Sequence, residues 1–236
     1  MKKYVLSLIL ILLAISLSNG QDLNGAWQST VTNNEGVSVQ YVAIVSGDYF
    51  SQAFFEKENG KFMGTMGGAL SLKNGSLTYT LEFASFDPDL VGTSDSLPYR
   101  LDGDKLYVDD KTWTRLDDGS PGNLAGAWLI SGRKRDGQIV KRDTSGPRKT
   151  MKILSGTRFQ WIAFNTETKE FMGTGGGTYT TTNGKYTENI GFFSRDDSRV
   201  GASLQFNYEL VDGDWHHYGL SSKGQPIYEV WSKRVK

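Results

Sequence analysis

The chain of 236 residues contains no cysteine. This absence excludes a disulfide framework, a thiolate metal site, a thiol nucleophile and a lipid-modified N-terminal cysteine. We therefore expect packing alone to hold the folded protein together.

Histidine is almost as scarce, since His216 and His217 are the two in the sequence. Adjacent residues of a strand point to opposite faces, so this pair cannot chelate one metal ion from the same face. We expect both to lie at the surface. No nucleophile, base and orienting group can be read from the spacing of other residues. The sequence thus predicts no catalytic residue, no metal site and no cofactor.

A charge excess of one sign is also absent, with 26 basic and 26 acidic residues. This balance argues against nucleic acid or an anionic membrane as a partner. The distribution is uneven, however. Residues 21–118 hold 7 basic and 15 acidic side chains, net −8, and residues 119–236 hold 17 and 11, net +6.

Long apolar runs are confined to the start of the chain. Lys2 and Lys3 precede an apolar run from Tyr4 to Leu17, and Ser18-Asn19-Gly20 offers small residues for cleavage. This pattern is typical of a secretory signal peptide, here residues 1–20. The run is shorter than the roughly 20 residues that span a bilayer. We expect a cleaved, exported chain.

What the sequence does contain is an internal repeat. The phrase "FMGTMGG" at 62–68 returns as "FMGTGGG" at 171–177, and residues 43–101 align with 152–210 without a gap, 23 of 59 positions being identical. About four identities would arise by chance, so the repeat is a tandem duplication. We expect domains at 21–118 and 124–236, joined by a linker at 119–123.

Each copy has the short alternating segments and turn signals of an all-β domain. Asn183-Gly184 between two alternating segments predicts a hairpin. We expect strands in the second copy near 126–131, 150–155, 158–165, 170–182, 185–193, 202–211, 214–221 and 228–235. A meander of eight strands removes its edges by closing, so the prediction is two tandem eight-stranded antiparallel barrels.

The glycine-x-tryptophan near the first strand of each copy, with a basic residue beside the last strand, resembles the lipocalin and calycin arrangement. The resemblance implies that a late basic side chain stacks on the tryptophan and helps to close the barrel. Carried over, Trp27 pairs with Arg115, and Trp128 pairs with Lys233 or Arg234.

The whole chain after the signal looks like a bacterial family of secreted lipocalin-like domains of unassigned function, and "FMGTGGGTY" is the most specific motif. This resemblance implies a lipocalin-like fold and a periplasmic or extracellular location. It supplies no catalytic residues.

The repeated glycines have two open interpretations. The residues after them read as strand and hairpin, and not as the helix that follows a phosphate-binding loop. The favoured interpretation is therefore a bulge or bend where a small barrel turns its corner. The alternative is a backbone left accessible at a ligand-binding mouth.

Alternation within residues 185–193 suggests which side chains face inward. Tyr186, Glu188, Ile190 and Phe192 share one parity. A carboxylate among apolar side chains needs a partner or has its pKa raised, so Glu188 could hold a polar ligand group or act as an acid. Alternatively, a bulge or the barrel mouth lets it reach water, which we favour.

Further aromatic residues could line a cavity in the second barrel. Phe206 and Tyr208 share one face of a strand with Leu204 and Leu210, and Phe159 and Trp161 come from another strand. Eight strands enclose a space that side chains fill or that admits one small ligand. Core filling is the alternative for most of these residues.

Basic side chains gather between residues 133 and 149, a segment that the first copy lacks. Arg135 and Arg142 are among them. We expect a loop over the open end of the barrel. It would capture an anionic ligand, such as a carboxylate or an acidic glycan, or else be a solvated loop or face the acidic first domain.

Three functions remain open. The leading hypothesis is non-enzymatic binding of a small, partly apolar and possibly anionic ligand in one barrel, with the second barrel favoured. The rival is a scaffold with filled barrels that docks a protein or glycan partner. The third is a barrel isomerase or hydrolase built around Glu188 and a histidine.

Overall fold

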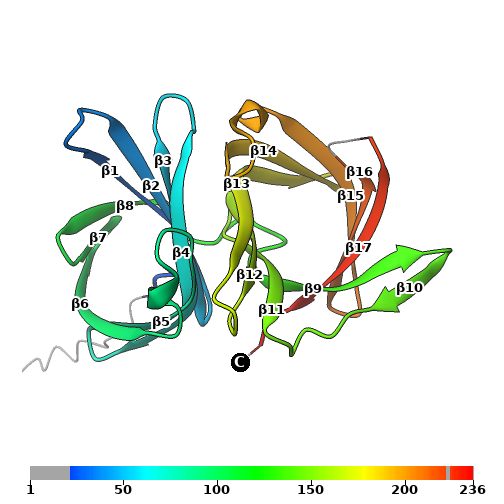
Figure 1. Cartoon of the computed structure of the whole chain (residues 1–236), viewed down its shortest axis with the longest axis horizontal. Coiled ribbons are helices and arrows are strands. Elements are labelled where there is room, and N and C mark those ends of the chain that lie inside the picture. Colours follow the sequence, from blue (N-terminus) through cyan, green and yellow to red (C-terminus); the bar gives the residue numbers. More distant parts are fainter. Residues whose placement is uncertain (1–21, 222–223, 236) are drawn as a thin grey trace, which may run out of the picture.

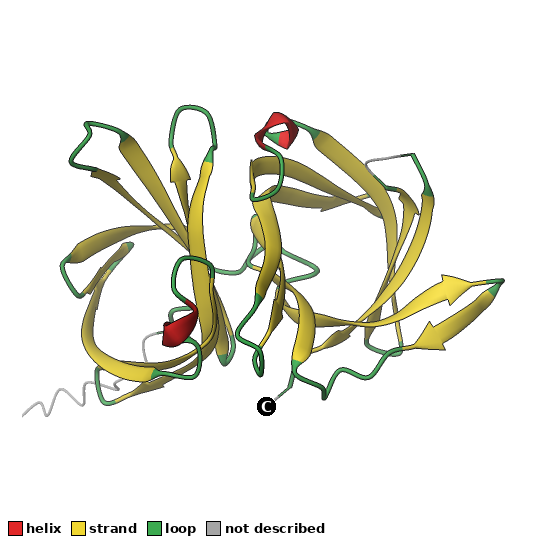
Figure 2. Cartoon of the chain, viewed as in Figure 1, coloured by secondary structure: helices red, strands yellow, loops and turns green. Residues whose placement is uncertain are grey.

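The computed structural model describes residues 22–221 and 224–235, so the predicted signal peptide lies outside the described residues. Strands make up most of the described chain (Figure 2). Two short 3-10 helices interrupt them, η1 (Pro88–Leu90) and η2 (Asp197–Arg199). Among the described helices, none has the length and apolar character needed to cross a membrane.

The first eight strands form a closed antiparallel barrel in sequence order, as predicted. The last strand pairs with the first, with Trp27 opposite Arg115. The strands are β1 (Gly25–Thr32), β2 (Ser38–Ser46), β3 (Tyr49–Glu56), β4 (Phe62–Lys73), β5 (Ser76–Ala84), β6 (Ser94–Asp102), β7 (Lys105–Val108) and β8 (Lys111–Asp117).

The second half forms another barrel beside the first (Figure 1). It closes where β17 pairs with β9. Its strands are β9 (Gly126–Arg135), β10 (Gln138–Lys141), β11 (Arg148–Leu154), β12 (Arg158–Asn165), β13 (Phe171–Thr182), β14 (Lys185–Phe193), β15 (Ser203–Val211), β16 (Asp214–Leu220) and β17 (Pro226–Lys233). The fold class is therefore two tandem antiparallel barrels, as the repeat predicted.

Strand β10 was not predicted. The segment 133–149, expected as a loop, instead extends β9 to Arg135 and returns along β10, so that Ile139 pairs with Lys134. The hairpin projects away from both barrels (Figure 1). The sequence did not reveal this strand because all four residues of β10 are exposed and bury no apolar face.

The repeated glycines lie at matching bulges of β4 and β13. The register with the next strand shifts between Gly67 and Gly68 in the first barrel and between Gly176 and Gly177 in the second. A Cβ on Gly177 would lie 2.0 Å from the carbonyl oxygen of Asn189, and one on Gly68 would lie 2.1 Å from that of Thr80. The glycines thus allow two backbones to approach closely, which supports the structural interpretation of the motif.

The bulge reverses the side-chain alternation of β14. Ile190 faces the interior of the second barrel, but the shift at Gly191 turns Phe192 outward. The prediction that Phe192 shares the inward face of Tyr186 is therefore wrong. Phe192 is buried against the first barrel instead, with its ring centroid 5.0 Å from that of Phe55.

The outward aromatic rings build the contact between the barrels. Phe83 of the first barrel packs 4.9 Å from Phe164 of the second, and these two positions match Phe192 and Phe55 in the repeat. Phe62 likewise stacks on its own counterpart, Phe171, at 6.2 Å. The interface is isologous, like that of a two-fold symmetric homodimer, although one chain supplies both sides.

Hydrogen bonds at the centre of the interface follow the same symmetry. The side-chain amide of Gln160 donates to Oγ1 of Thr65 at 2.8 Å and to Oγ1 of Thr174 at 2.9 Å, and these threonines match in the repeat. All three residues are buried. Because a buried polar group is costly without a partner, this bridge favours one relative orientation of the barrels.

Asp117 joins the end of β8 to the turn between β11 and β12. Its carboxylate accepts hydrogen bonds from the backbone of Gly156 at 2.9 Å and from both the backbone and hydroxyl of Thr157, at 3.0 and 2.6 Å. The hydroxyl of Ser155 also donates to it. Although burial opposes them, these hydrogen bonds hold the pKa of Asp117 below its usual value.

We expect Gly177→Ala to lower the free energy of unfolding by about 2–3 kcal/mol, because its methyl group would collide with the backbone of β14. The matched control is Gly191→Ala in the same bulge, where the nearest atoms to a Cβ lie 3.5 and 3.7 Å away. It should change stability by less than about 0.5 kcal/mol. Urea unfolding measures both. Equal effects would contradict the structural role of the motif.

Asp117→Asn should lower the free energy of unfolding at pH 7 by about 1–3 kcal/mol. A carboxyl group whose folded pKa is depressed stabilises the protein above its unfolded pKa, about 3.9, and loses this contribution as the pH falls through the folded value. The difference between wild type and variant should therefore shrink below about pH 4. Urea unfolding across pH checks this, with the exposed Asp102→Asn as control. A difference that is constant with pH would contradict it.

Candidate functional site

The predicted aromatic residues of the second barrel pack into its interior. Phe159 and Phe206 are buried in one cluster, and Trp161 and Tyr208 pack against it half-buried. Leu204 joins them, but Leu210 is exposed near the end of β15. The cluster is completed by residues that include Trp128, Tyr179, Tyr186, Trp215 and Trp231.

Glu188 lies inside this cluster with 5% of its surface exposed. The interpretation that it reaches water is therefore wrong. Its Oε1 atom lies 2.7 Å from the ammonium group of Lys152 and accepts a hydrogen bond from the hydroxyl of Tyr186 at 2.8 Å. Burial, with Glu188 adding to it, raises the pKa of Tyr186 well above its usual value, so this hydroxyl stays a donor at neutral pH.

Lys152 was missed by the sequence analysis, although it is the partner that Glu188 needs. It is 5% exposed, and its ammonium lies 4.9, 5.0 and 5.3 Å from the rings of Tyr186, Trp215 and Trp231. Such a cage stabilises a desolvated cation. The available signal was alternation, since Lys152 shares its face of β11 with the inward Leu154.

The two histidines separate to opposite faces of β16, but they do not both lie at the surface. His217 is 3% exposed inside the barrel, whereas His216 is half-buried and its Nδ1 lies 2.8 Å from the hydroxyl of Tyr228. Because strands alternate, one of two adjacent residues in a barrel wall must face the interior. Burial, together with the positive charge of Lys152, lowers the pKa of His217, so it is neutral at pH 7.

The first barrel carries smaller side chains at the matching interior positions. Ala43 lies opposite Trp27 in β1, as Lys152 lies opposite Trp128 in β9. Leu106 lies opposite Trp113, as Trp215 lies opposite Trp231. At three further positions of the repeat, a leucine of the first barrel matches an aromatic residue of the second. Leu70 matches Tyr179, Leu77 matches Tyr186, and Leu97 matches Phe206.

These smaller residues leave a cavity of about 200 Å³ inside the first barrel. The prediction favoured a cavity in the second barrel, yet this one lies in the first, because an alanine and several leucines replace the lysine and aromatic rings. Its wall is mostly apolar and includes Trp27, Ala43, Phe50, Leu77, Leu97 and Trp113.

Polar groups border this cavity at a few points. The indole Nε1 of Trp113 is buried and has no hydrogen-bond partner among the described residues. Asp109, in the turn between β7 and β8, and Lys111, the first residue of β8, also line the cavity. Burial raises the pKa of Tyr79, and the charges of Asp95 and Asp109 raise it further, so its hydroxyl remains protonated at neutral pH.

The residues predicted to help close each barrel come from its first and last strands, and these strands pair in the structure. The guanidinium of Arg115 stacks 4.0 Å over the ring of Trp27. In the second barrel it is Lys233, with its ammonium 4.9 Å from the ring of Trp128, that occupies the corresponding place. Arg234 turns away and pairs with Glu82 of the first barrel.

Arg135 and Arg142 stay apart from the interior residues. Arg135 is exposed at the end of β9, and Arg142 is half-buried just beyond β10. Burial, with Arg148 and Arg133 adding to it, lowers the pKa of Arg142. Within the described part of the chain, no hydrogen bond or ion pair joins either arginine to Glu188, Phe159 or Phe206. Residues 22–221 and 224–235 also contain no cluster of histidine and carboxylate side chains fit for a metal ion.

Comparison with known families gives one finding. A family model described as "Domain of unknown function (DUF4488)" matches residues 123–236, a span that contains every strand of the second barrel. No curated protein matches the chain.

Lys152→Met should lower the free energy of unfolding by about 3–5 kcal/mol, because it leaves the carboxylate of Glu188 buried without its cation. Adding Glu188→Gln should recover at least half of this loss, since the amide carries no charge and its oxygen still accepts from Tyr186. A double-mutant cycle by urea unfolding measures the coupling. Additive losses would contradict the pairing.

Proposed function

We propose that the protein is a non-enzymatic binding protein that holds a small, largely apolar ligand inside the first barrel. The observation that carries this proposal is the cavity of about 200 Å³ between β1–β8, bounded mainly by aliphatic and aromatic side chains. Pockets of this kind, apolar with a few polar groups, are typical of small-molecule sites.

The size and chemistry of the cavity restrict the ligand. An engineered apolar cavity of about 150 Å³ binds benzene, so this cavity suits a single ring or a short branched chain. Trp113 is one of the wall residues, and its buried indole N–H has no hydrogen-bond partner among the described residues, so we propose that it donates to the ligand. A ligand with one acceptor oxygen on an apolar body matches these features, because a buried donor without a partner is costly.

The compartment and the finer family assignment belong to the same proposal. We infer that the chain is exported, because residues 1–20 have the charge and apolar pattern of a signal peptide. We also infer a lipocalin-like, calycin-type relationship. The meander barrels and the stacking of Arg115 on Trp27 support it.

A docking function is the second candidate, and the β9–β10 hairpin favours it. This hairpin exposes Ile139 and Val140, at 43% and 49%, beside Arg133, Lys134, Arg135 and Lys141. An acidic protein or glycan would complement such a surface. The isomerase or hydrolase hypothesis gains no comparable support, because Lys152 and Tyr186 already occupy the carboxylate of Glu188.

Toluene should raise the melting temperature of the wild-type protein, since a ligand that binds only the folded state stabilises it. Ala43→Phe places a ring in the cavity and should abolish this shift. The control Val31→Phe adds the same ring at an exposed position of β1 and should leave the shift intact. Differential scanning calorimetry measures all three. An equal shift in Ala43→Phe would overturn the site.

Trp113→Phe tests the proposal that the indole N–H of this wall residue donates to the ligand. Wild type should bind acetophenone about five- to tenfold more tightly than α-methylstyrene, which has a similar shape and no acceptor oxygen. The variant should lose this preference while keeping its affinity for α-methylstyrene within about twofold. Isothermal titration calorimetry gives the four dissociation constants. A preference unchanged in Trp113→Phe would contradict the role of the indole.

A further inference from the structure

The pseudo-symmetric contact between the barrels creates two related clefts, one on each side of the central Gln160 bridge. The plugged cleft is the one lined by Tyr49, Glu82, Phe83, Met151 and Arg234, most of which pack in the shared core or pair there. The open cleft is the one lined by the counterparts of these residues and has a volume of about 370 Å³. The two differ because the two copies of the repeat have different residues at a few matching positions.

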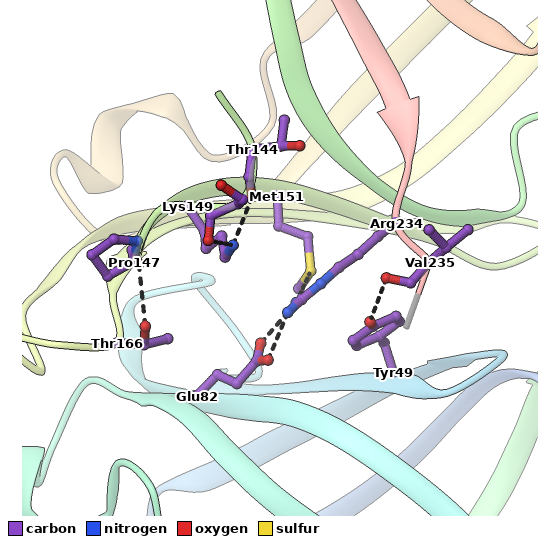
Figure 3. Close-up of polar contacts among 10 residues, drawn as sticks. Tyr49, Glu82, Thr144, Pro147, Lys149, Met151, Thr166, Arg234 and Val235 are labelled. Carbon is purple, nitrogen blue, oxygen red and sulfur yellow. Dashed lines mark hydrogen bonds and ion pairs between the residues drawn. The ribbon is translucent and has the colours of Figure 1, made fainter. Parts of the chain in front are cut away.

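An ion pair fills the plugged cleft. The guanidinium of Arg234 donates two hydrogen bonds to the carboxylate of Glu82, at 2.7 and 2.6 Å, and lies 4.1 Å over the ring of Tyr49 (Figure 3). The hydroxyl of Tyr49 donates to the carbonyl oxygen of Val235 at 3.3 Å. The side chain of Arg234 is 8% exposed. Residues 234 and 235, which follow β17, thus occupy this cleft as a bound segment would.

The open cleft lacks both members of that ion pair. Leu116 follows Trp113 by three positions, as Arg234 follows Trp231, so leucine stands where the plugged cleft has arginine. Gly191 is the repeat counterpart of Glu82, so the carboxylate is missing too. The loss of two long side chains accounts for the empty volume.

The walls of the open cleft are mainly apolar. Val42, Ile44, Ala53 and Phe55 line it from the first barrel, and Phe192 lines it from the second. The glutamine side chains in the lining already form hydrogen bonds with other residues of the protein. Gln40, for example, donates to the carbonyl oxygens of Ser29 and Tyr41, both at 3.1 Å.

Arg158, the counterpart of Tyr49, is the one charged side chain that lines the open cleft among the described residues. Its guanidinium makes no hydrogen bond or close ion pair within residues 22–221 and 224–235. Burial lowers its pKa and the charge of Asp117 opposes this, but an arginine stays protonated at neutral pH. Asp117 does not neutralise it directly, because its carboxylate accepts from Ser155, Gly156 and Thr157 instead.

We propose that the open cleft is a second binding site, for a small molecule with an apolar body and one carboxylate group. The apolar walls would bury the body, and the free guanidinium of Arg158 would form the two parallel hydrogen bonds that a carboxylate accepts. In the open cleft, this ligand would take the place that the Arg234–Glu82 ion pair has in the plugged cleft. The site is separate from the cavity of the first barrel, and it needs both barrels to form.

The charge requirement is tested with a matched pair of probes, 4-phenylbutyrate and 4-phenylbutan-1-ol. Isothermal titration calorimetry at pH 7 should show the carboxylate binding at least about tenfold more tightly to wild type. Arg158→Gln should remove this preference. The control is Arg148→Gln, which removes an exposed arginine of β11 and should preserve it. Equal binding of both probes to wild type, or an unchanged preference in Arg158→Gln, would overturn the proposal.

The position of the site is tested by transplanting the plug. The double variant Leu116→Arg with Gly191→Glu rebuilds the Arg234–Glu82 pair in the open cleft, and Gly191 has space for a side chain, since the nearest atom to a Cβ lies 3.5 Å away. It should lose binding of 4-phenylbutyrate and keep a cooperative thermal transition.

Ala43→Phe, which fills the first barrel, should leave the affinity for 4-phenylbutyrate unchanged. Undiminished binding to a folded plug variant would overturn the proposal, as would loss of binding in Ala43→Phe alone. Because Arg158→Gln changes a half-buried side chain that makes no hydrogen bond in the described structure, it provides an answer even if the double variant fails to fold.

Discussion

The close approach of two backbones at a glycine is the constraint on which the rest of the structure depends. At Gly68 and Gly177 the absence of a side chain lets β4 and β13 come within contact of the next strand, and a bulge forms in both barrels. The bulge bends the wall, as closure of a small barrel requires. It also turns Phe83 and Phe192 outward, where they become the contact between the barrels.

The two interiors have diverged after duplication of one architecture. The second barrel places Lys152 and Glu188 among aromatic rings, and such a pair contributes little net stability because desolvation offsets its attraction. The first barrel has Ala43 and Tyr79 at the same places and retains a cavity. One copy therefore has a filled core, while the other keeps an interior cavity, the space in which we propose that a ligand binds.

Much of the fold could be predicted because the strand signals and the repeat were local features of the sequence. The Asn183-Gly184 turn, for instance, joins β13 and β14 as expected. The site was harder to predict. The partner of Glu188 comes from a strand more than 30 residues away, Phe192 changes face at a bulge, and β10 buries no apolar residue. Each depends on register or tertiary contact, which a single sequence does not specify.

The clasp between Arg234 and Glu82 joins the segment that follows β17 to the first barrel. The aromatic face around Phe55, Phe62 and Phe83 packs against rings of the second barrel, so it has no cover until that barrel has folded. A nascent or truncated chain would thus expose an adhesive surface, and such surfaces promote aggregation. Holding that face apart from other copies during synthesis would be a task for chaperones in the cell.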